Sequence, residues 1–303
     1  MRKVFILCFS LLTFVISAEE SRVVLSYNSG LTYKTGYVDE LVYNQSSILS
    51  KLHWEERNIL GHIFNTSIRY GRLSLSGSML YSLPCDRNYI QDYDYLFDEN
   101  ISHFSEHNNQ LEKDVSLYLK ATFCFPIINS FEFIPYIGYF KSNKKFSAYN
   151  GYSQYPEEGV WTGNESKKEV IGYVISYEQQ IDSLLFGFDL TYLFNKKLKL
   201  SFNAIYYPTL HIKSLDSHFL RKVQFLDVMD QEYAYELGLK LTYLLTTHLD
   251  ILVNFSYQKI KCSGLSYSNS IGYKDSDFVL SPGITSLTII DSKLFSISMR
   301  YNF

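Results

Sequence analysis

The sequence has few long apolar runs and little net charge. Beyond residue 18, no stretch of the 303-residue chain offers the about 20 predominantly apolar residues that a membrane-spanning helix needs. The 28 basic and 31 acidic residues leave a net charge of −3. Proteins that bind nucleic acid usually carry a basic patch and a high isoelectric point. A helical membrane protein and a nucleic-acid-binding protein are therefore both disfavoured.

The one long apolar run lies at the start of the chain. Two basic residues precede the run VFILCFSLLTFVI, which is followed by SAEE. A short basic segment, an apolar segment and small residues are typical of a secretory signal peptide, and this run is too short to span a membrane as a helix. We expect a signal peptide over residues 1–18, cleaved near Ser17 or Ala18, and one mature domain over residues 19–303.

Aromatic residues are abundant, and apolar residues alternate with polar ones. The chain contains 27 tyrosines and 22 phenylalanines. The segments DVSLYLKATF, RLSLSGSML, LKLSFNAIYY and HLDILVNFSY alternate in the manner of β-strands with one apolar face. On this pattern Leu117 and Phe202 point outward into lipid, and Ser116 and Ser201 point inward. A soluble β-sandwich also alternates, but aromatic girdles are typical of outer-membrane barrels, so we predict an all-β transmembrane barrel.

The final residues strengthen this prediction. In KLFSISMRYNF one face carries Phe295, Ile297, Met299, Tyr301 and the terminal Phe303. An amphipathic last strand that ends in an aromatic residue resembles the signal that directs bacterial outer-membrane barrels to their assembly machinery. We therefore expect a monomer in the bacterial outer membrane, in contact with outer-membrane lipid and, during biogenesis, with the barrel assembly machinery.

The turns between the alternating runs predict the number of strands. Short turns are legible at FNTSIRYG, CFPIINS, LFNKK and LTTHLD. Long polar connections separate them, over residues 43–50, 83–112, 150–168, 215–230 and 263–281. Four short turns and five long connections predict ten antiparallel strands, with the long loops on the extracellular side. A barrel of about this size is filled by side chains, so a wide pore is not expected.

Two acidic pairs stand at the ends of predicted strands. NYIQDYDYLFD contains Asp92 and Asp94, and HIKSLDSHFL contains Asp216 and His218, each pair two residues apart. Residues two apart on a strand point to the same face. The pairs follow the third and seventh strands, which lie opposite one another in a ten-stranded cylinder. Acidic residues in surface loops are usually only solvated, but the joint placement of both pairs predicts a site over the outer mouth.

The same residue types can also bind a metal ion. Three aspartates and a histidine could form an oxygen-rich metal site, and this stays an alternative, although we expect no metal. The other histidines have no spacing that requires a ligand role, and we expect His53, His103 and His211 to be loop or wall residues.

From about Ser26 to Phe303 the sequence resembles the omptin family of outer-membrane endoproteases. The segment DELVYNQSSILSKLHW is similar to the family's first strand and loop, including its Glu-x-Val-Tyr and Leu-x-Trp elements. QDYDY resembles its Asp-x-Asp motif, SLDSH its Asp-x-His motif, and IGYFKSNKKFSAYNG its fifth strand. Each motif is short, but their order in a chain with ten predicted strands makes the combination specific.

The resemblance implies a metal-free, aspartic-type endopeptidase in which water attacks the peptide bond. His218 would be the general base, because an unperturbed histidine titrates near neutral pH. Asp216 would orient the histidine ring, as a carboxylate does in the serine-protease triad. Asp92 would hold the water together with His218, and Asp94 would help to place the water or the substrate.

Substrate recognition matches the family only in part. Glu40 matches the glutamate that lines the pocket for a basic residue before the cut, where charge-assisted contacts select Arg or Lys. Its partner in the family is an aspartate, and that position holds Ser214 here. With Glu40 as the only carboxylate of the pocket, we expect a basic preference that persists but is weaker.

The outer wall also departs from the family. Omptins require lipopolysaccharide, which basic and aromatic residues of the outer wall hold. Tyr139 matches one of these residues, whereas Lys141, Asn143 and Gln180 replace others. The expectation of an activating lipid is therefore weakened, and we expect no other cofactor.

Together these features predict an outer-membrane endopeptidase that cuts peptides or proteins near basic residues, with its site facing the exterior. An alternative is a catalytically silent barrel that acts as an adhesin or receptor through its loops. A narrow channel is a third hypothesis, which a filled interior disfavours.

Overall fold

The computed structural model describes residues 23–97, 100–156, 160–271 and 278–303, so the predicted signal peptide lies outside the described residues. Within these ranges no helix is long and apolar enough to cross a membrane. The strands are β1 (Val23–Asn44), β2 (Ser47–Tyr70), β3 (Leu73–Ser82), β4 (Cys85–Phe97), β5 (Asn100–Phe123), β6 (Phe125–Ile128), β7 (Phe131–Gln154), β8 (Lys168–Leu193), β9 (Leu198–Tyr206), β10 (His211–His218), β11 (Val223–Leu244), β12 (Leu249–Ser270) and β13 (Val279–Asn302).

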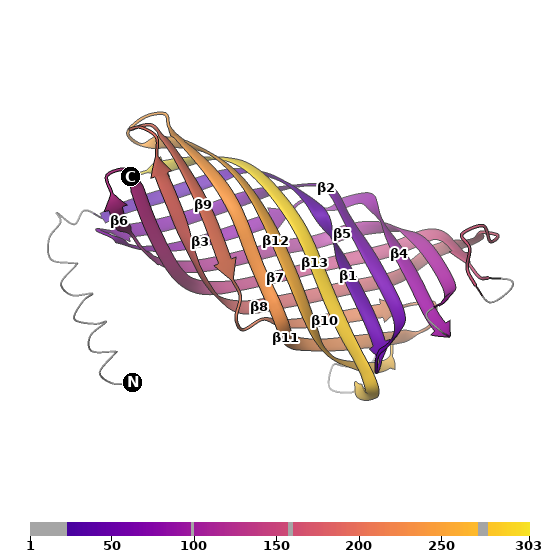
Figure 1. The fold of residues 1–303 in the computed structure, drawn as a ribbon. Coiled ribbons are helices and arrows are strands. Elements are labelled where there is room, and N and C mark those ends of the chain that lie inside the picture. The colour runs from indigo at the N-terminus through magenta and orange to yellow at the C-terminus, as the bar shows by residue number, and fades with distance from the viewer. Residues whose placement is uncertain (1–22, 98–99, 157–159, 272–277) are drawn as a thin grey trace, which may run out of the picture.

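The strands close into one antiparallel ring (Figure 1). β1 pairs with both β2 and β13, and the pairing of β7 with β8 completes the circle. β3 and β4 are two parts of one interrupted strand between β2 and β5, and β9 and β10 are two parts of another between β8 and β11. When the short β6 is left aside, the described residues form ten strands around the ring, which is the predicted number.

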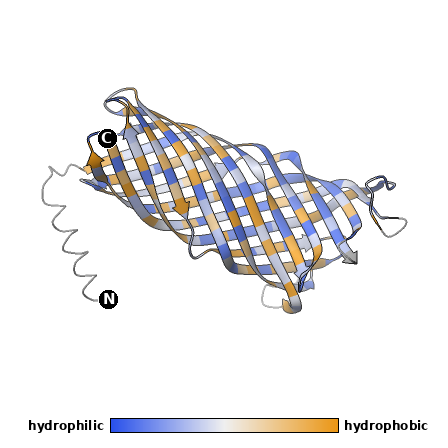
Figure 2. Cartoon of the chain, in the orientation of Figure 1, coloured by the Kyte–Doolittle hydropathy of each residue, from blue (hydrophilic) through white to orange (hydrophobic). Residues whose placement is uncertain are grey.

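Side chains alternate between the two faces of the wall. Leu117 and Phe202 are exposed on the outside, and Ser116 and Ser201 are buried on the inside, as predicted. The Ser116 hydroxyl donates a hydrogen bond of 3.0 Å to that of Ser142 in the interior. Figure 2 shows hydrophobic and hydrophilic residues alternating along the strands. The assigned faces of these strands are therefore confirmed.

The last residues of β11 lie at the end of the barrel that holds the C terminus, because Leu241 pairs with Val253 of β12, which pairs with Ile297 of β13. Figure 1 marks this end by the letter C. Leu237, Leu239 and Leu241 are exposed there. The second half of β13 and the terminal residue present one exposed apolar row, made of Phe295, Ile297, Met299, Tyr301 and Phe303. We call these side chains, with Leu117 and Phe202, the outer apolar band, which suits contact with lipid. The opposite end, where β4 and β10 end, is called the mouth.

Most residues predicted to form long connections are strand. The range 83–112 contains β4 and the first half of β5, and the range 215–230 contains the end of β10 and the start of β11. The sequence interpretation used polarity as the sign of a loop. Strands that extend beyond the lipid need no apolar outer face, so polarity did not separate strand from loop there. The wall therefore continues past the outer apolar band and forms the mouth.

Large aromatic side chains fill the interior beneath the mouth. The ring of Trp54 stacks on those of Phe146 and Tyr177, with centroids 5.3 Å and 5.7 Å apart. All three side chains are fully buried and come from β2, β7 and β8. The interior is thus packed, as expected for a barrel of about ten strands.

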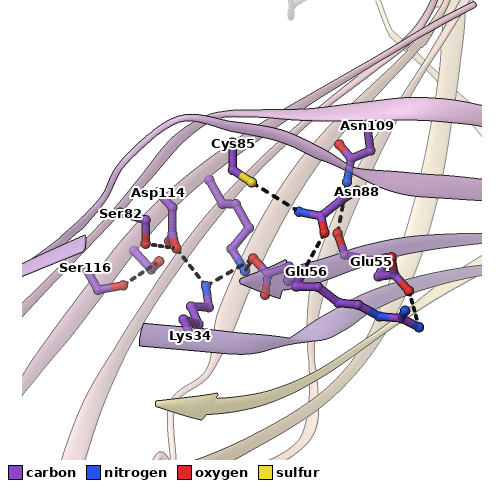
Figure 3. Close-up of polar contacts among 12 residues, drawn as sticks. Lys34, Glu55, Glu56, Ser82, Cys85, Asn88, Asn109, Asp114 and Ser116 are labelled. Atoms are coloured by element: carbon purple, nitrogen blue, oxygen red, sulfur yellow. Dashed lines mark hydrogen bonds and ion pairs between the residues drawn. The ribbon is translucent and has the colours of Figure 1, made fainter. Parts of the chain in front are cut away.

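Figure 3 shows a cluster of paired charges that includes Lys34, Glu56 and Asp114. Glu56 follows Trp54 on β2, so this cluster lies further from the mouth than the aromatic stack. Lys34 Nζ lies 3.1 Å from Glu56 Oε1 and 2.7 Å from Asp114 Oδ2, and Lys144 Nζ lies 2.9 Å from Glu56 Oε1. Ser82 donates a further hydrogen bond of 2.7 Å to Asp114. We call the four buried charges Lys34, Glu56, Asp114 and Lys144 the interior belt. It links β1, β2, β5 and β7, which lie on one side of the ring.

Candidate active site

Four predicted side chains lie on the inner face of the wall at the mouth. β4 carries Asp92 and Asp94, and β10 carries Asp216 and His218, close to the end of each strand. Asp92, Asp216 and His218 are buried, and Asp94 is partly buried. Each pair shares a face because side chains two residues apart on a strand point the same way. The strand geometry inferred from the spacing is therefore present in the structure.

His218 is held by Asp216. The Nε2 atom of His218 lies 2.5 Å from Asp216 Oδ2. With Nε2–H donating to the carboxylate, Nδ1 is the ring nitrogen that can accept a proton. Burial lowers the pKa of His218, but the charge and the hydrogen bond of Asp216 outweigh burial and raise this pKa above its ordinary value.

The two pairs face one another across the mouth. Arg221, in the connection that follows β10, donates a hydrogen bond through its guanidinium to Asp94 Oδ2 on the opposite side. His103 of β5 contacts the same carboxylate oxygen through Nδ1, at 3.1 Å. Asp92 and His218 lie close enough for the charge of each to shift the pKa of the other. The structure thus brings the four predicted residues together and adds Arg221 and His103 to them.

The two aspartates of β4 have opposite electrostatic environments. Burial, and then the charge of Asp94, raise the pKa of Asp92 to about 6. Burial also acts to raise the pKa of Asp94, but hydrogen bonds and positive charge from His103 and Arg221 outweigh it and lower this pKa below its ordinary value. Near neutral pH Asp94 is therefore ionised, and Asp92 is the carboxyl that can exchange a proton.

A metal ion fits this cluster poorly. Among the residues that the structure describes, the group with metal-ligand geometry is Asp92, Asp94 and His103, whose possible ligand atoms lie within 4.8 Å of one another. The predicted alternative, in which Asp216 and His218 are ligands, is not such a group. Asp94 Oδ2 already accepts a hydrogen bond from Arg221, and this positive charge would repel a cation.

A second buried cluster lies beside the Asp216 and His218 pair. Glu40 of β1 and Ser214 of β10, the two predicted substrate-binding residues, are each 1% exposed. Asp227 of β11 is equally buried, and its carboxyl lies within reach of the Glu40 carboxyl. The charge of Asp216 also acts on Glu40. We call the cluster of Glu40, Ser214 and Asp227 the carboxyl pocket, after the omptin pocket for a basic residue that Glu40 and Ser214 match in sequence.

The residues considered for lipid binding lie on the outer wall. Tyr139 and Lys141 of β7 and Gln180 of β8 are exposed, and Asn143 pairs with Gln180 in the strand register. Their side chains are therefore separated by the wall from those of the mouth. A role in binding lipopolysaccharide stays a prediction.

The sequence interpretation missed three residues of these clusters. His103 was expected to be a loop or wall residue, and Arg221 and Asp227 had been given no role. Their proximity depends on strand register, which pairs His103 with Asp94 and Asp227 with Ser214. A short hairpin joins β10 to β11. From this hairpin the register could have been counted in the sequence, because each residue of β10 before the turn pairs with one residue of β11 after it. This count would have placed Asp227 opposite Ser214.

Comparisons with known proteins agree with this architecture. A sequence model of the Omptin family matches residues 22–301. The crystal structure of the outer membrane protease OmpT from Escherichia coli is similar with a TM-score of 0.80 and 16% sequence identity, covering 94% of this chain and 98% of OmpT. The structure of OprG from Pseudomonas aeruginosa covers 93% of this chain and 97% of its own, with a TM-score of 0.37 and 10% identity. No curated protein matches the sequence. The likeness to OmpT confirms the predicted barrel fold.

Proposed function

Because this chain belongs to the omptin family and is a bacterial outer-membrane protease, we propose that it is an aspartic-type endopeptidase that hydrolyses peptide bonds near basic residues. The proposal rests on one observation, the arrangement of the Asp216 and His218 pair opposite Asp92 and Asp94 at the mouth. The mouth lies at the end away from the C terminus (Figure 1). We propose that this end faces the cell exterior.

Water is the nucleophile in the proposed reaction. His218 Nδ1 takes a proton from the water as its oxygen attacks the carbonyl carbon of the peptide, and the same proton then passes to the leaving amine. Asp216, bound to Nε2, fixes the ring and stabilises the imidazolium that forms. A positioned acid or base of this kind contributes typically about 10² to 10⁴-fold to the rate.

The two aspartates of β4 have different roles in the proposed reaction. Asp92 faces His218 and holds the water between them, and its raised pKa suits a group that shares a proton with the water. Asp94 stays ionised and is fixed by His103 and Arg221. It therefore orients the water or the substrate instead of exchanging protons itself.

The substrate preference follows from charge. Burial and the charges of Asp216 and Asp227 raise the pKa of Glu40 above its ordinary value. A basic side chain beside this carboxyl would stabilise its charged form, so the pocket favours a peptide that places Arg or Lys there. The partners of the mouth would then be peptides or proteins with exposed basic residues.

The alternatives make different use of the barrel. A channel is disfavoured because the Trp54, Phe146 and Tyr177 stack and the interior belt occupy the interior. An adhesin or receptor would retain the mouth without needing His218 as a base. Cleavage by intact cells therefore separates the protease from the silent barrel.

The test uses intact cells that display the protein, incubated with a fluorogenic peptide bearing paired basic residues. We expect cleavage that resists chelators and serine-protease reagents and that is lost in cells displaying His218→Ala at equal surface level. Cleavage that a chelator abolishes would contradict the metal-free mechanism. No cleavage by a surface-exposed, folded parent barrel would favour the adhesin or receptor.

A further inference from the structure

We propose that Asp227 is a second carboxylate that binds the basic side chain of the substrate together with Glu40. This inference rests on the proposed function and names a specificity-determining residue for it. The sequence predicted that Glu40 would be the only carboxylate of the pocket, because Ser214 replaces the family's aspartate. In the structure the buried carboxyl of Asp227 lies beside Glu40.

Strand register explains how the acid reaches the pocket. Ser214 of β10 and Asp227 of β11 are directly paired residues of the antiparallel ladder. The Cα atoms of directly paired residues lie about 4.5 to 5.5 Å apart, and their side chains share a face. A carboxylate at either position therefore points to the same region of the barrel interior. The acid is therefore displaced by one strand around the ring and stays at the same level.

The pocket contains buried oxygen atoms whose hydrogen bonds are poorly formed. The atoms without a partner of good geometry are Glu40 Oε2, both carboxylate oxygens of Asp227, and the hydroxyls of Ser214, Ser266, Ser286 and Thr288. Their nearest polar neighbours belong to the same cluster, because Ser266 and Ser286 act on Asp227, and Ser214 and Thr288 act on Tyr177. All of these side chains are 1% exposed or less. A buried polar atom left unpaired costs about 1 to 3 kcal/mol, more if it is charged. Such a set of oxygen atoms is complementary to a ligand that brings several N–H donors.

The charge around the pocket points to a cation. The charges acting on Glu40 come from Asp216, Asp227 and Asp92, which are all acidic. In the interior belt, by contrast, each buried carboxylate contacts a lysine. The acids of the belt have lysines of the protein as partners. The acids that act on Glu40 in the carboxyl pocket have no lysine or arginine of the protein among the charges named for Glu40. An arginine guanidinium brings five N–H donors and a lysine ammonium brings three.

The wall of the pocket also suits the stem of such a side chain. Tyr177, whose ring stacks on Trp54, lies close enough for the charge of Glu40 to act on it. Apolar stems of Lys and Arg pack well on aromatic surfaces while the charged end reaches its partners. Basic side chains of peptides are therefore the ligand class that fits both ends of the pocket.

The first experiment measures binding without cleavage. The probe is p-aminobenzamidine, a fluorescent amidinium, titrated into the purified barrel in detergent micelles. We expect Asp227→Asn to weaken binding by about ten- to a hundredfold, because charge-assisted hydrogen bonds are the strong ones. Asp230→Asn, which alters an exposed acid of the same strand, should bind like the parent. Equal binding by Asp227→Asn and the parent would overturn the proposal, whether or not the barrel is a peptidase.

The second experiment moves the acid back by one strand. In Asp227→Ser, the ratio of kcat/KM for peptides with a basic or a neutral residue before the cut should fall by about ten- to a hundredfold. The double change Asp227→Ser with Ser214→Asp should restore most of this ratio, which a purely structural role of Asp227 would not predict. A ratio that stays low in the double variant, with native heat-modifiable gel mobility, would exclude the shared space. A parent that cleaves no peptide contradicts the proposed function and leaves the binding experiment to decide on Asp227.

Discussion

The barrel contains two sets of buried charges with opposite organisation. In the interior belt, Lys34 and Lys144 contact the carboxylates of Glu56 and Asp114 at 2.7 to 3.1 Å. In the carboxyl pocket, acids face other acids, and several buried oxygen atoms lack partners. Both sets are removed from water, so burial alone does not account for the difference.

This difference separates a structural role from a binding role. A buried charge that has lost its partner is strongly unfavourable, so breaking the belt should lower the stability of the barrel. In the carboxyl pocket the described residues place no cation beside the acids, which is unfavourable in the same way. On our proposal a cationic ligand relieves this cost when it binds. Charges at the two levels of one barrel should therefore respond differently to substitution.

The largest effect is expected at the mouth, on activity. Substituting Ala for Asp92, Asp94, Asp216 or His218 should lower turnover by about 10² to 10⁴-fold, since each removes a positioned acid, base or its support. Heat-modifiable mobility should show that each variant still folds. His211→Ala, which changes an exposed histidine at the start of β10, is the matched control. Undiminished turnover in His218→Ala would refute the proposed base.

The belt should respond in stability. Lys34→Met leaves Asp114 as a buried anion without its lysine and should lower the free energy of unfolding by about 3 to 5 kcal/mol. Adding Asp114→Asn removes the stranded charge, keeps a partner for Ser82 and should recover most of the loss. Unfolding by denaturant in micelles measures both. If the single and double variants were equally destabilised, the belt would act through packing and not through charge.

The outer face of the wall should tolerate a charge near the mouth but not in the outer apolar band. Leu117→Arg places a charge in the outer apolar band and should reduce folding in bilayers by about 2 to 4 kcal/mol, the cost at the bilayer midplane. Ile171, on β8 near the mouth, is 76% exposed, and Ile171→Arg should be tolerated because that part of the wall stands outside the lipid. Equal folding yields for the two variants in vesicles would contradict the position assigned to the band.

The fold was predictable because its signal repeats along the whole chain. Alternation in segments such as DVSLYLKATF assigned Leu117 to the outside and Ser116 to the inside, and both lie there. A strand has only two faces, so a few apolar positions fix all the others. The extended wall at the mouth was missed because outside the lipid the outer face can be polar, and the alternation disappears.

The candidate site was predictable only where the information is local. The spacing of Asp216 and His218 within one strand needs no knowledge of neighbours. Asp227 enters the pocket through its register with Ser214, and Arg221 reaches Asp94 from the far side of the ring. Such contacts depend on the position of the hairpin turn and on which strands face one another in the closed ring. A short sequence motif contains neither kind of information.

The smallest effect is expected from pH, and it tests the carboxyl pocket as a charged group. Burial raises the pKa of Asp227 to about 6, so this carboxyl is charged above that pH and neutral below it. The preference for basic over neutral peptides should therefore fall by about fourfold between pH 7.5 and pH 5.5. Taking the ratio of kcat/KM at each pH cancels the titration of Asp92 and His218, which affects both peptides alike. The pH dependence of this ratio should be weaker in Asp227→Asn, in which Glu40, whose pKa burial also raises, is the remaining carboxyl of the pocket. A parent ratio that rises as the pH falls would mean that Asp227 does not bind the substrate cation.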